Sequence, residues 1–138
     1  MIDRRCTARQ DGGVITPFDN PQAELAWMFL QCLQGGDIDE CFALLSDDFT
    51  YWNVATRESA DKASLRRQIE RRKQDLELTL DLVRYIADGD SVVIEAHGDG
   101  VTAAGTRYDS PYVFIFDTRD GQIVSLREYS DTRVAATT

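Results

Sequence analysis

The segment RYDSPYVFIFDTRDGQIVSLREYSD, residues 107–131, decides the fold of the chain. Apolar and polar residues alternate along it, which is the period of a strand with one buried face. The Asp120-Gly121 pair interrupts the alternation, and such a pair is typical of a tight hairpin turn. The segment therefore predicts two antiparallel strands, at roughly 107–118 and 121–131.

Two further strands precede this hairpin, because the same alternation runs over residues 76–87 and 91–103. Turn residues at 88–90 separate these two runs, and a wider turn at 103–105 leads into the hairpin. Connections this short make neighbouring strands antiparallel, since a parallel return needs a crossover of about a dozen residues. The second half of the chain is therefore predicted to be an antiparallel sheet.

The first half of the chain is predicted to be mainly helical. A cap at Asn20 begins a helix that the glycines at 35–36 end, and a capping-box spacing at 37–40 opens a short second helix. Residues 49–54 are rich in aromatic and β-branched residues and predict a strand, whereas 60–74 return to a helical pattern. The predicted order is α-α-β-α-β-β-β-β, an α+β domain.

The length of 138 residues suits one domain, and its 43% hydrophobic content is that of a chain that folds. Residues 1–17 are polar and lack a sustained period, so we expect a loosely ordered N-terminal arm. Residues 18–138 are then the single domain.

The formal net charge of -9, from 24 acidic and 15 basic residues, argues against two classes of partner. An acidic surface repels the phosphates of nucleic acid and the headgroups of anionic membranes. One basic cluster lies in a helical stretch, and it is interpreted as a solvated helix face rather than an anion site; it comprises Arg66, Arg67, Arg71, Arg72 and Lys73. We expect neither nucleic-acid nor membrane binding.

The cysteines and the N-terminus point to a cytoplasmic protein. The N-terminal residues lack the apolar core of a secretory signal, and no run approaches the ~20 apolar residues that span a bilayer. Cys6, Cys32 and Cys41 are odd in number, and the last two fall in helical apolar patterns, so we expect buried, reduced thiols rather than a disulfide. The sequence contains neither a histidine cluster, which would indicate a metal, nor a glycine-rich loop after a strand, which would indicate a nucleotide. We therefore expect no cofactor.

The element order, with the strand YDSPYVFIF, the turn DGQI and the final REYSD, resembles the SnoaL-like branch of the nuclear transport factor 2-like superfamily. That branch includes ketosteroid isomerase-like proteins, polyketide cyclases and limonene-1,2-epoxide hydrolase. The resemblance covers about residues 20–135. It implies a cone-shaped half-barrel in which helices and a curved sheet enclose one pocket, and whose outer sheet face pairs into a homodimer.

Alternation along the strands assigns side chains to the two faces of the predicted sheet. On the strand at 91–103 the polar set is predicted to face the pocket; it comprises His97 and Asp99 together with Val93 and Glu95. The opposite face becomes the predicted dimer surface, with Val92, Ile94, Val113 and Ile115. On the last strand, Glu128 shares a face with Val124 and Leu126.

The resemblance also suggests which residues carry chemistry. Glu128 is similar in position to an acidic residue that works as acid or base in several relatives. Tyr51 and Asn53, as Y-x-N, match a pair that helps to hold the catalytic water of the epoxide hydrolase. His97 and Asp99 stand where that enzyme has an arginine and an aspartate. These five residues are the candidate catalytic set.

A carboxylate in an apolar cone loses hydration, so its pKa rises toward the range in which it both takes and gives a proton. Glu128 is therefore the candidate base, with His97 oriented by Asp99. Three aromatic residues are candidates for lining an apolar ligand site: Trp27, Tyr112 and Phe114.

Each of these residues also has a structural interpretation. Glu128 can pair with an arginine such as Arg107 or Arg127, His97 can be a satisfied polar residue, and the aromatic residues can be core. Two functions therefore remain open. One is a cofactor-independent isomerase, cyclase or hydrolase that acts on a hydrophobic oxygenated small molecule by carboxylate acid-base chemistry. The other is a non-catalytic ligand-binding or dimeric interaction module.

Overall fold

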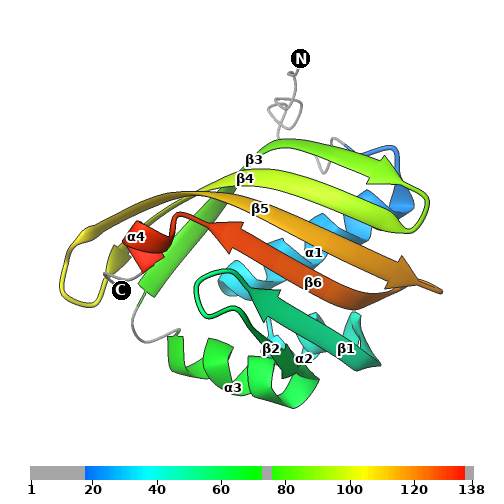
Figure 1. Cartoon of the computed structure of the whole chain (residues 1–138), viewed down its shortest axis with the longest axis horizontal. Helices are drawn as coiled ribbons and strands as arrows, with labels where there is room; N and C mark the ends of the chain where they lie inside the picture. The colour runs from blue at the N-terminus through cyan, green and yellow to red at the C-terminus, as the bar shows by residue number, and fades with distance from the viewer. Residues whose placement is uncertain (1–17, 73–75, 136–138) are drawn as a thin grey trace.

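A six-stranded mixed sheet, in the order β2-β1-β6-β5-β4-β3, is the frame of the protein (Figure 1). The computed structural model describes residues 18–72 and 76–135, so the predicted arm at 1–17 lies outside the described residues. The strands are β1 (Leu45–Asn53), β2 (Glu58–Asp61), β3 (Leu76–Asp88), β4 (Ser91–Thr102), β5 (Arg107–Arg119) and β6 (Gln122–Ser130). The sheet is open, with β2 and β3 at its edges, and it confirms the predicted α+β cone.

The antiparallel hairpins of the second half are confirmed. β3 pairs with β4, β4 with β5 and β5 with β6, all antiparallel. The turn between β5 and β6 places Asp120 at φ 53° and Gly121 at φ 79°. Two successive residues with positive φ are what a type I′ hairpin turn requires, which explains why the Asp-Gly pair predicted it. β1 instead pairs with β6 in parallel, and this makes the sheet mixed.

Helices cover one face of this sheet, and α1 runs behind the strands in Figure 1. The helices are α1 (Pro21–Gly35), α2 (Ile38–Ala43), α3 (Lys62–Arg72) and the short α4 (Thr132–Ala135). The predicted cap is present, because the Asn20 side chain accepts a hydrogen bond of 2.9 Å from the backbone N–H of Ala23. β2 and α4 are short elements that the sequence did not predict. Among the described residues, none of the helices has the length and apolar character needed to cross a membrane.

The core lies between α1 and the inner face of the sheet, and it reverses the predicted faces of β4. Val92 and Ile94 are fully buried, whereas His97 and Glu95 are on the outer face and partly exposed. The inner face must bury apolar surface against the helices, and unpaired polar groups there cost free energy. Glu95 and His97 therefore face outward, and Val92 and Ile94 are not part of an outer dimer surface.

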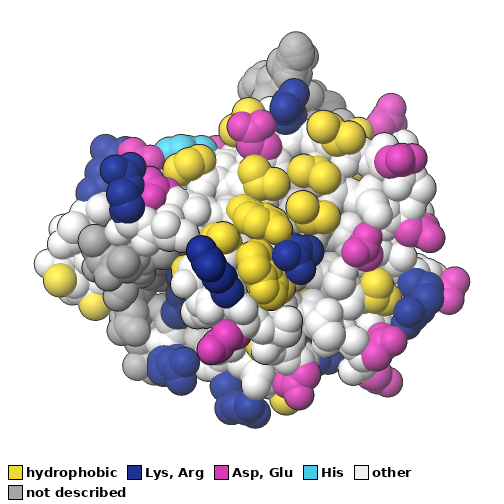
Figure 2. Space-filling model, viewed as in Figure 1, with side chains coloured by type: hydrophobic (Ala, Val, Ile, Leu, Met, Phe, Trp, Pro, Cys, Tyr) yellow, Lys and Arg dark blue, Asp and Glu magenta, His cyan; other side chains and the backbone are white. Residues whose placement is uncertain are grey.

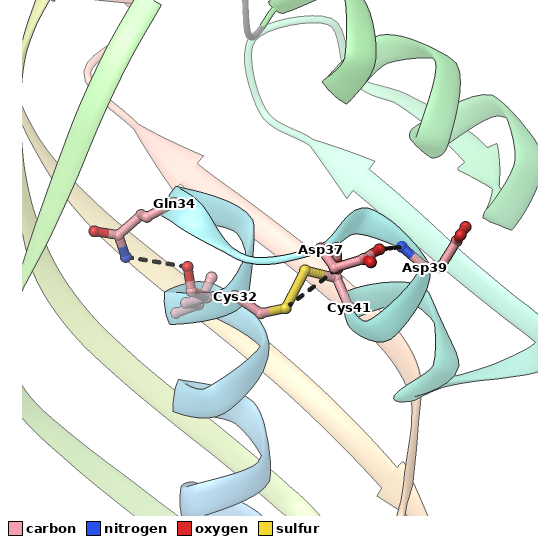
Figure 3. The surroundings of a disulfide bond; sticks show 6 residues. Cys32, Gln34, Asp37, Asp39 and Cys41 are labelled. Atoms are coloured by element: carbon pink, nitrogen blue, oxygen red, sulfur yellow. Dashed lines mark hydrogen bonds between the residues drawn. A yellow bond between two sulfur atoms is a disulfide. The ribbon is translucent and has the colours of Figure 1, made fainter.

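Cys32, near the end of α1, forms a disulfide with Cys41 of α2, so the expectation of reduced thiols is wrong (Figure 3). Their Cα atoms are 5.6 Å apart because the chain reverses between the helices. A Cβ on Gly36 would lie 2.7 Å from the Cys32 sulfur, so the tight corner needs glycine there. Disulfides are typical of oxidising compartments, so the cysteines do not support a cytoplasmic location.

The disulfide should stabilise the fold measurably. We expect the double variant Cys32→Ser/Cys41→Ser to lose about 2–3 kcal/mol of its free energy of unfolding, because the short cross-link restricts the unfolded chain. Urea denaturation without reductant measures this loss. Dithiothreitol should lower the stability of the wild type to that of the variant and leave the variant unchanged; a wild type insensitive to reductant would contradict the cross-link.

Candidate active site

A cavity of about 740 Å³ lies between the inner face of the sheet and the helices α1 and α3. This volume is in the range of small-molecule sites. Much of its lining is apolar, and includes Phe29, Leu30, Leu33, Leu65, Ile69, Leu80, Phe114 and Leu126. Polar side chains that line it include Tyr51, Gln68, Arg72, Tyr112 and Glu128. A mainly apolar wall with a few polar groups is the usual composition of a ligand site.

Three of the predicted catalytic residues come together at this cavity, with Tyr51 and Glu128 in its lining and Asn53 hydrogen-bonded to both. The Tyr51 hydroxyl donates a hydrogen bond of 2.9 Å to Oε1 of Glu128. The amide nitrogen of Asn53 donates to the Tyr51 hydroxyl at 2.6 Å and approaches Oε2 of Glu128 at 3.4 Å. The Asn53 side-chain oxygen accepts from the backbone N–H of Ala55, which orients the amide nitrogen toward the carboxylate. Tyr51, Asn53 and Glu128 therefore form one hydrogen-bonded group.

The surroundings of Glu128 raise the pKa of its carboxyl. Burial raises its pKa above the ordinary value, while the positive charge of Arg72 and the hydrogen bond from Tyr51 partly oppose that rise. The pKa of Tyr51 is raised as well, first by burial and then by the negative charge of Glu128. Tyr51 therefore keeps its proton, and Glu128 is the member of the group that exchanges one.

A second polar feature is a buried pair of tyrosines on β5. The hydroxyls of Tyr108 and Tyr112 lie 2.5 Å apart, and the ring of Tyr112 stacks on Phe114 with centroids 5.3 Å apart. Burial, and then the hydrogen bond with Tyr108, raise the pKa of Tyr112. Because the pair shares one hydrogen bond but holds two protons, the second proton is available to another acceptor. Since Tyr112 lines the cavity, that acceptor can be a ligand oxygen.

The other predicted site residues do not join this group. His97 is on the outer face, where its Nε2 lies 2.5 Å from the Asp109 carboxylate. Asp99 borders the cavity, but its carboxylate pairs with Arg107 at 3.3 Å. The structure therefore separates His97 from Glu128, and the expectation that His97 faces the pocket is wrong.

The three predicted ligand-binding aromatics divide in the same way. Tyr112 and Phe114 line the large cavity. Trp27 does not line it and instead packs near Phe18, with ring centroids 6.5 Å apart. Trp27 is therefore part of the packing outside the site.

Sequence reasoning missed three residues of the site: Gln68 and Arg72, which line the cavity, and Tyr108, which is hydrogen-bonded to Tyr112. A signal for them existed. Gln68 and Arg72 lie three and seven positions after Leu65, so they share the inner face of α3 with it. Tyr108 and Tyr112 are four residues apart on one strand, and alternation therefore places them on the same face.

An open six-stranded mixed sheet with helices over one face defines a cone-like α+β fold, and the carboxylate of Glu128 lines the cavity between them. The family model of the SnoaL-like domain matches residues 28–126. The chain therefore belongs to the SnoaL-like family.

Solved structures show the same fold. The chain is 24% identical to an LEH-like epoxide hydrolase from M. tuberculosis, with a TM-score of 0.73 over 85% of this chain and 87% of that one. It is 23% identical to a candidate polyketide cyclase from Xanthomonas campestris pv. campestris, with a TM-score of 0.75 over 86% and 97%. A protein with a ketosteroid isomerase-like fold from Catenulispora acidiphila is 20% identical, with a TM-score of 0.69 over 77% and 84%. Among curated proteins, no match is found.

The raised pKa of Glu128 has a measurable consequence for stability. A carboxyl whose pKa is higher in the folded chain contributes stability that is fully present below its unfolded pKa, near 4.5, and is lost as the pH rises through the folded pKa. The variant Glu128→Gln is neutral at every pH and avoids this loss. Its stability relative to the wild type should therefore increase between pH 4.5 and the folded pKa and then level off.

Urea denaturation of both proteins across this pH range measures the difference. The matched control is Glu95→Gln, which removes a carboxylate from the outer face, where it pairs with Arg84 at 3.1 Å. A difference between wild type and Glu128→Gln that does not change with pH would show that the Glu128 carboxyl is not desolvated.

Proposed function

We propose that this protein transfers a proton at a carbon next to a carbonyl group of a hydrophobic, oxygenated small molecule, as a cofactor-independent isomerase or cyclase. The observation that carries the proposal is Glu128, a desolvated carboxylate held by Tyr51 and Asn53 inside an apolar cavity. The raised pKa of this carboxyl suits a group that takes a proton and returns it.

The proposed reaction starts from ionised Glu128. Its carboxylate removes a proton from the carbon beside the carbonyl, and the electrons of that C–H bond move to form an enolate. The Tyr112 hydroxyl donates a hydrogen bond to the enolate oxygen, with Tyr108 donating in turn to Tyr112. In isomerisation, the enolate takes the proton back from Glu128 at another carbon of its conjugated system. In cyclisation, the enolate carbon attacks a second carbonyl carbon, whose C=O π bond opens to an alkoxide, and the alkoxide takes the proton from Glu128.

The proton-transfer reaction is favoured over epoxide hydrolysis by the arrangement of β4. Hydrolysis needs a base for the water and a separate acid for the departing oxygen. Of the two residues at the positions resembling the arginine and aspartate of the epoxide hydrolase, His97 bonds to Asp109 on the outer face and Asp99 is paired with Arg107. Neither residue is therefore hydrogen-bonded to Glu128 as the acid partner that the resemblance suggested for hydrolysis.

The test uses a small hydrophobic ketone, 2-tetralone, in D₂O, with loss of its α-proton signals followed by NMR. We expect the wild type to accelerate exchange and Glu128→Gln to reduce the rate by about a hundredfold or more, the usual worth of a positioned base. Tyr112→Phe should lower the rate less, because it removes one hydrogen bond to the enolate.

The control for this experiment is Glu95→Gln, the same chemical change on the outer face of β4, which should exchange at the wild-type rate. Unchanged exchange in Glu128→Gln would refute the assignment of the base. Binding of 2-tetralone without any accelerated exchange in the wild type would favour the non-catalytic ligand-binding function instead.

We also propose that the outer face of the sheet pairs two copies of the chain. Hydrophobic side chains gather in the middle of this face in Figure 2. The partly buried Val113 and Ile115 of β5 lie on it, next to Val93 of β4. Beside them the guanidinium of Arg127 lies 4.1 Å from the centroid of the Trp52 ring. An apolar patch with an aromatic and an arginine at its side has the composition of an interface core.

The substitution Ile115→Asp should shift the protein from dimer to monomer, because a charge in the middle of the interface loses its hydration on pairing. Sedimentation velocity measures the mass of each species. Met28→Asp is the control, since this side chain is 49% exposed on α1 and lies on a helix rather than on the outer sheet face. A wild type that is monomeric at all concentrations would contradict the proposed pairing.

A further inference from the structure

A second cavity, of about 220 Å³, adjoins the large one and has a different lining. The two cavities share Gln68, Arg72 and Glu128. The rest of the small cavity is mainly polar, with Asn53, Thr56, Arg71, Tyr108 and Ser130 beside Ala55. The carboxylate of Glu128 therefore stands at the junction of an apolar space and a small polar one.

Positive charge dominates the small cavity. Its charged side chains are Arg71, Arg72 and Glu128. Within residues 18–72 and 76–135, no carboxylate lies within ion-pair distance of Arg71 or Arg72, whereas Arg66 on the same helix pairs with Asp39. Arg71 and Arg72 are therefore positive charges beside the cavity that no ion pair among the described residues neutralises.

Neutral donors complete the small cavity. Within the described parts of the chain, the side-chain amide of Gln68 and the hydroxyl of Ser130 have no hydrogen-bond partner. A guanidinium presents a planar fork of N–H donors that matches the two oxygens of a carboxylate. The amide and the hydroxyl add donors from α3 and β6, so the donors converge from two elements.

We propose that the small cavity binds a carboxylate group of the substrate, with Arg72 as its principal partner, while the apolar body of the molecule fills the large cavity. This inference rests on the proposed function and names its substrate class, a hydrophobic carbonyl compound that also carries a carboxylate. Arg71 and Arg72 of the basic cluster then belong to an anion site, whereas Arg66 and Arg67 lie outside it.

Such a carboxylate would also act on Glu128. The positive charge of Arg72 holds the pKa of Glu128 lower than burial alone would set it. An anion bound to Arg72 offsets that charge, so Glu128 becomes a stronger base when the substrate is in place. Binding of the substrate carboxylate at Arg72 thereby increases the basicity of the group that removes the proton at the reacting carbon.

The test compares 2-naphthoate with its uncharged analogue 2-naphthamide by isothermal titration calorimetry at pH 7. The two probes share the apolar body and differ in the group that enters the small cavity. We expect the wild type to bind the carboxylate about tenfold more tightly than the amide, the usual worth of one charged hydrogen bond. Arg72→Gln should lose this preference while its affinity for 2-naphthamide stays the same.

Arg67→Gln is the matched control, because Arg67 carries the same charge on the same helix but bonds to Ser64 and lines neither cavity. It should keep the preference for the carboxylate. Equal affinities of the wild type for the two probes, or a preference that survives in Arg72→Gln, would overturn the proposal.

The variant Glu128→Gln separates this proposal from the proposed function. Its preference for 2-naphthoate should be at least that of the wild type, since the substitution removes a like charge. If the ketone experiment fails but this preference is found, the carboxylate site stands without the enzyme. If exchange depends on Glu128 but the preference is absent, the enzyme stands and the carboxylate site falls.

Discussion

The parallel pairing of β1 with β6 is the contact on which the site depends. Its register sets Tyr51 beside Leu126 and Asn53 beside Glu128. Residues that are 75 and more positions apart in the chain thereby share a hydrogen-bonded group. The backbone N–H of Val54 continues the contact by donating to the carbonyl of Glu128 at 3.0 Å. A slip of one residue would turn either Tyr51 or Glu128 to the outer face, since side chains alternate along a strand.

This pairing also explains how a carboxylate is kept within the protein. A buried carboxylate without partners costs far more than a buried amide, and proteins tolerate it only where hydrogen bonds are supplied. Tyr51 and Asn53 supply them from β1, and Arg72 adds a positive charge from α3. The helix α3 thus supplies the positive charge, and the sheet supplies the hydrogen bonds. Two separate elements therefore determine the pKa and the position of the Glu128 carboxyl.

Much of the fold could be predicted from the sequence because its signals are local. Alternation and the Asp120-Gly121 turn define the strands, and the cap at Asn20 defines the start of α1. The face that Glu128 shares with Leu126 was predicted correctly, since Leu126 is buried and Arg127 is exposed. The prediction of Val124 on that face was wrong, because a register shift between β5 and β6 buries Ile123 instead. The faces of β4 were not predicted correctly, because both sets of residues along it alternate cleanly. To decide which face of β4 points inward, one must know which side of the sheet the helices cover. The alternation of residues along the strand does not give that information.

The residues missed in the site share one physical cause. Arg72 belongs to a run of charges that is exposed by any composition rule, and only its spacing from Leu65 and Ile69 places it on the cavity side. Gly98 is a related case: a Cβ there would lie 2.6 Å from the Tyr112 ring, so the absence of a side chain on β4 is what admits the tyrosine pair. Position along an element therefore decides the role of a residue more than its type does. In this cone Arg72, at the end of a helix, lines the cavity. His97, which sequence reasoning favoured as a catalytic residue, lies on the outer surface instead.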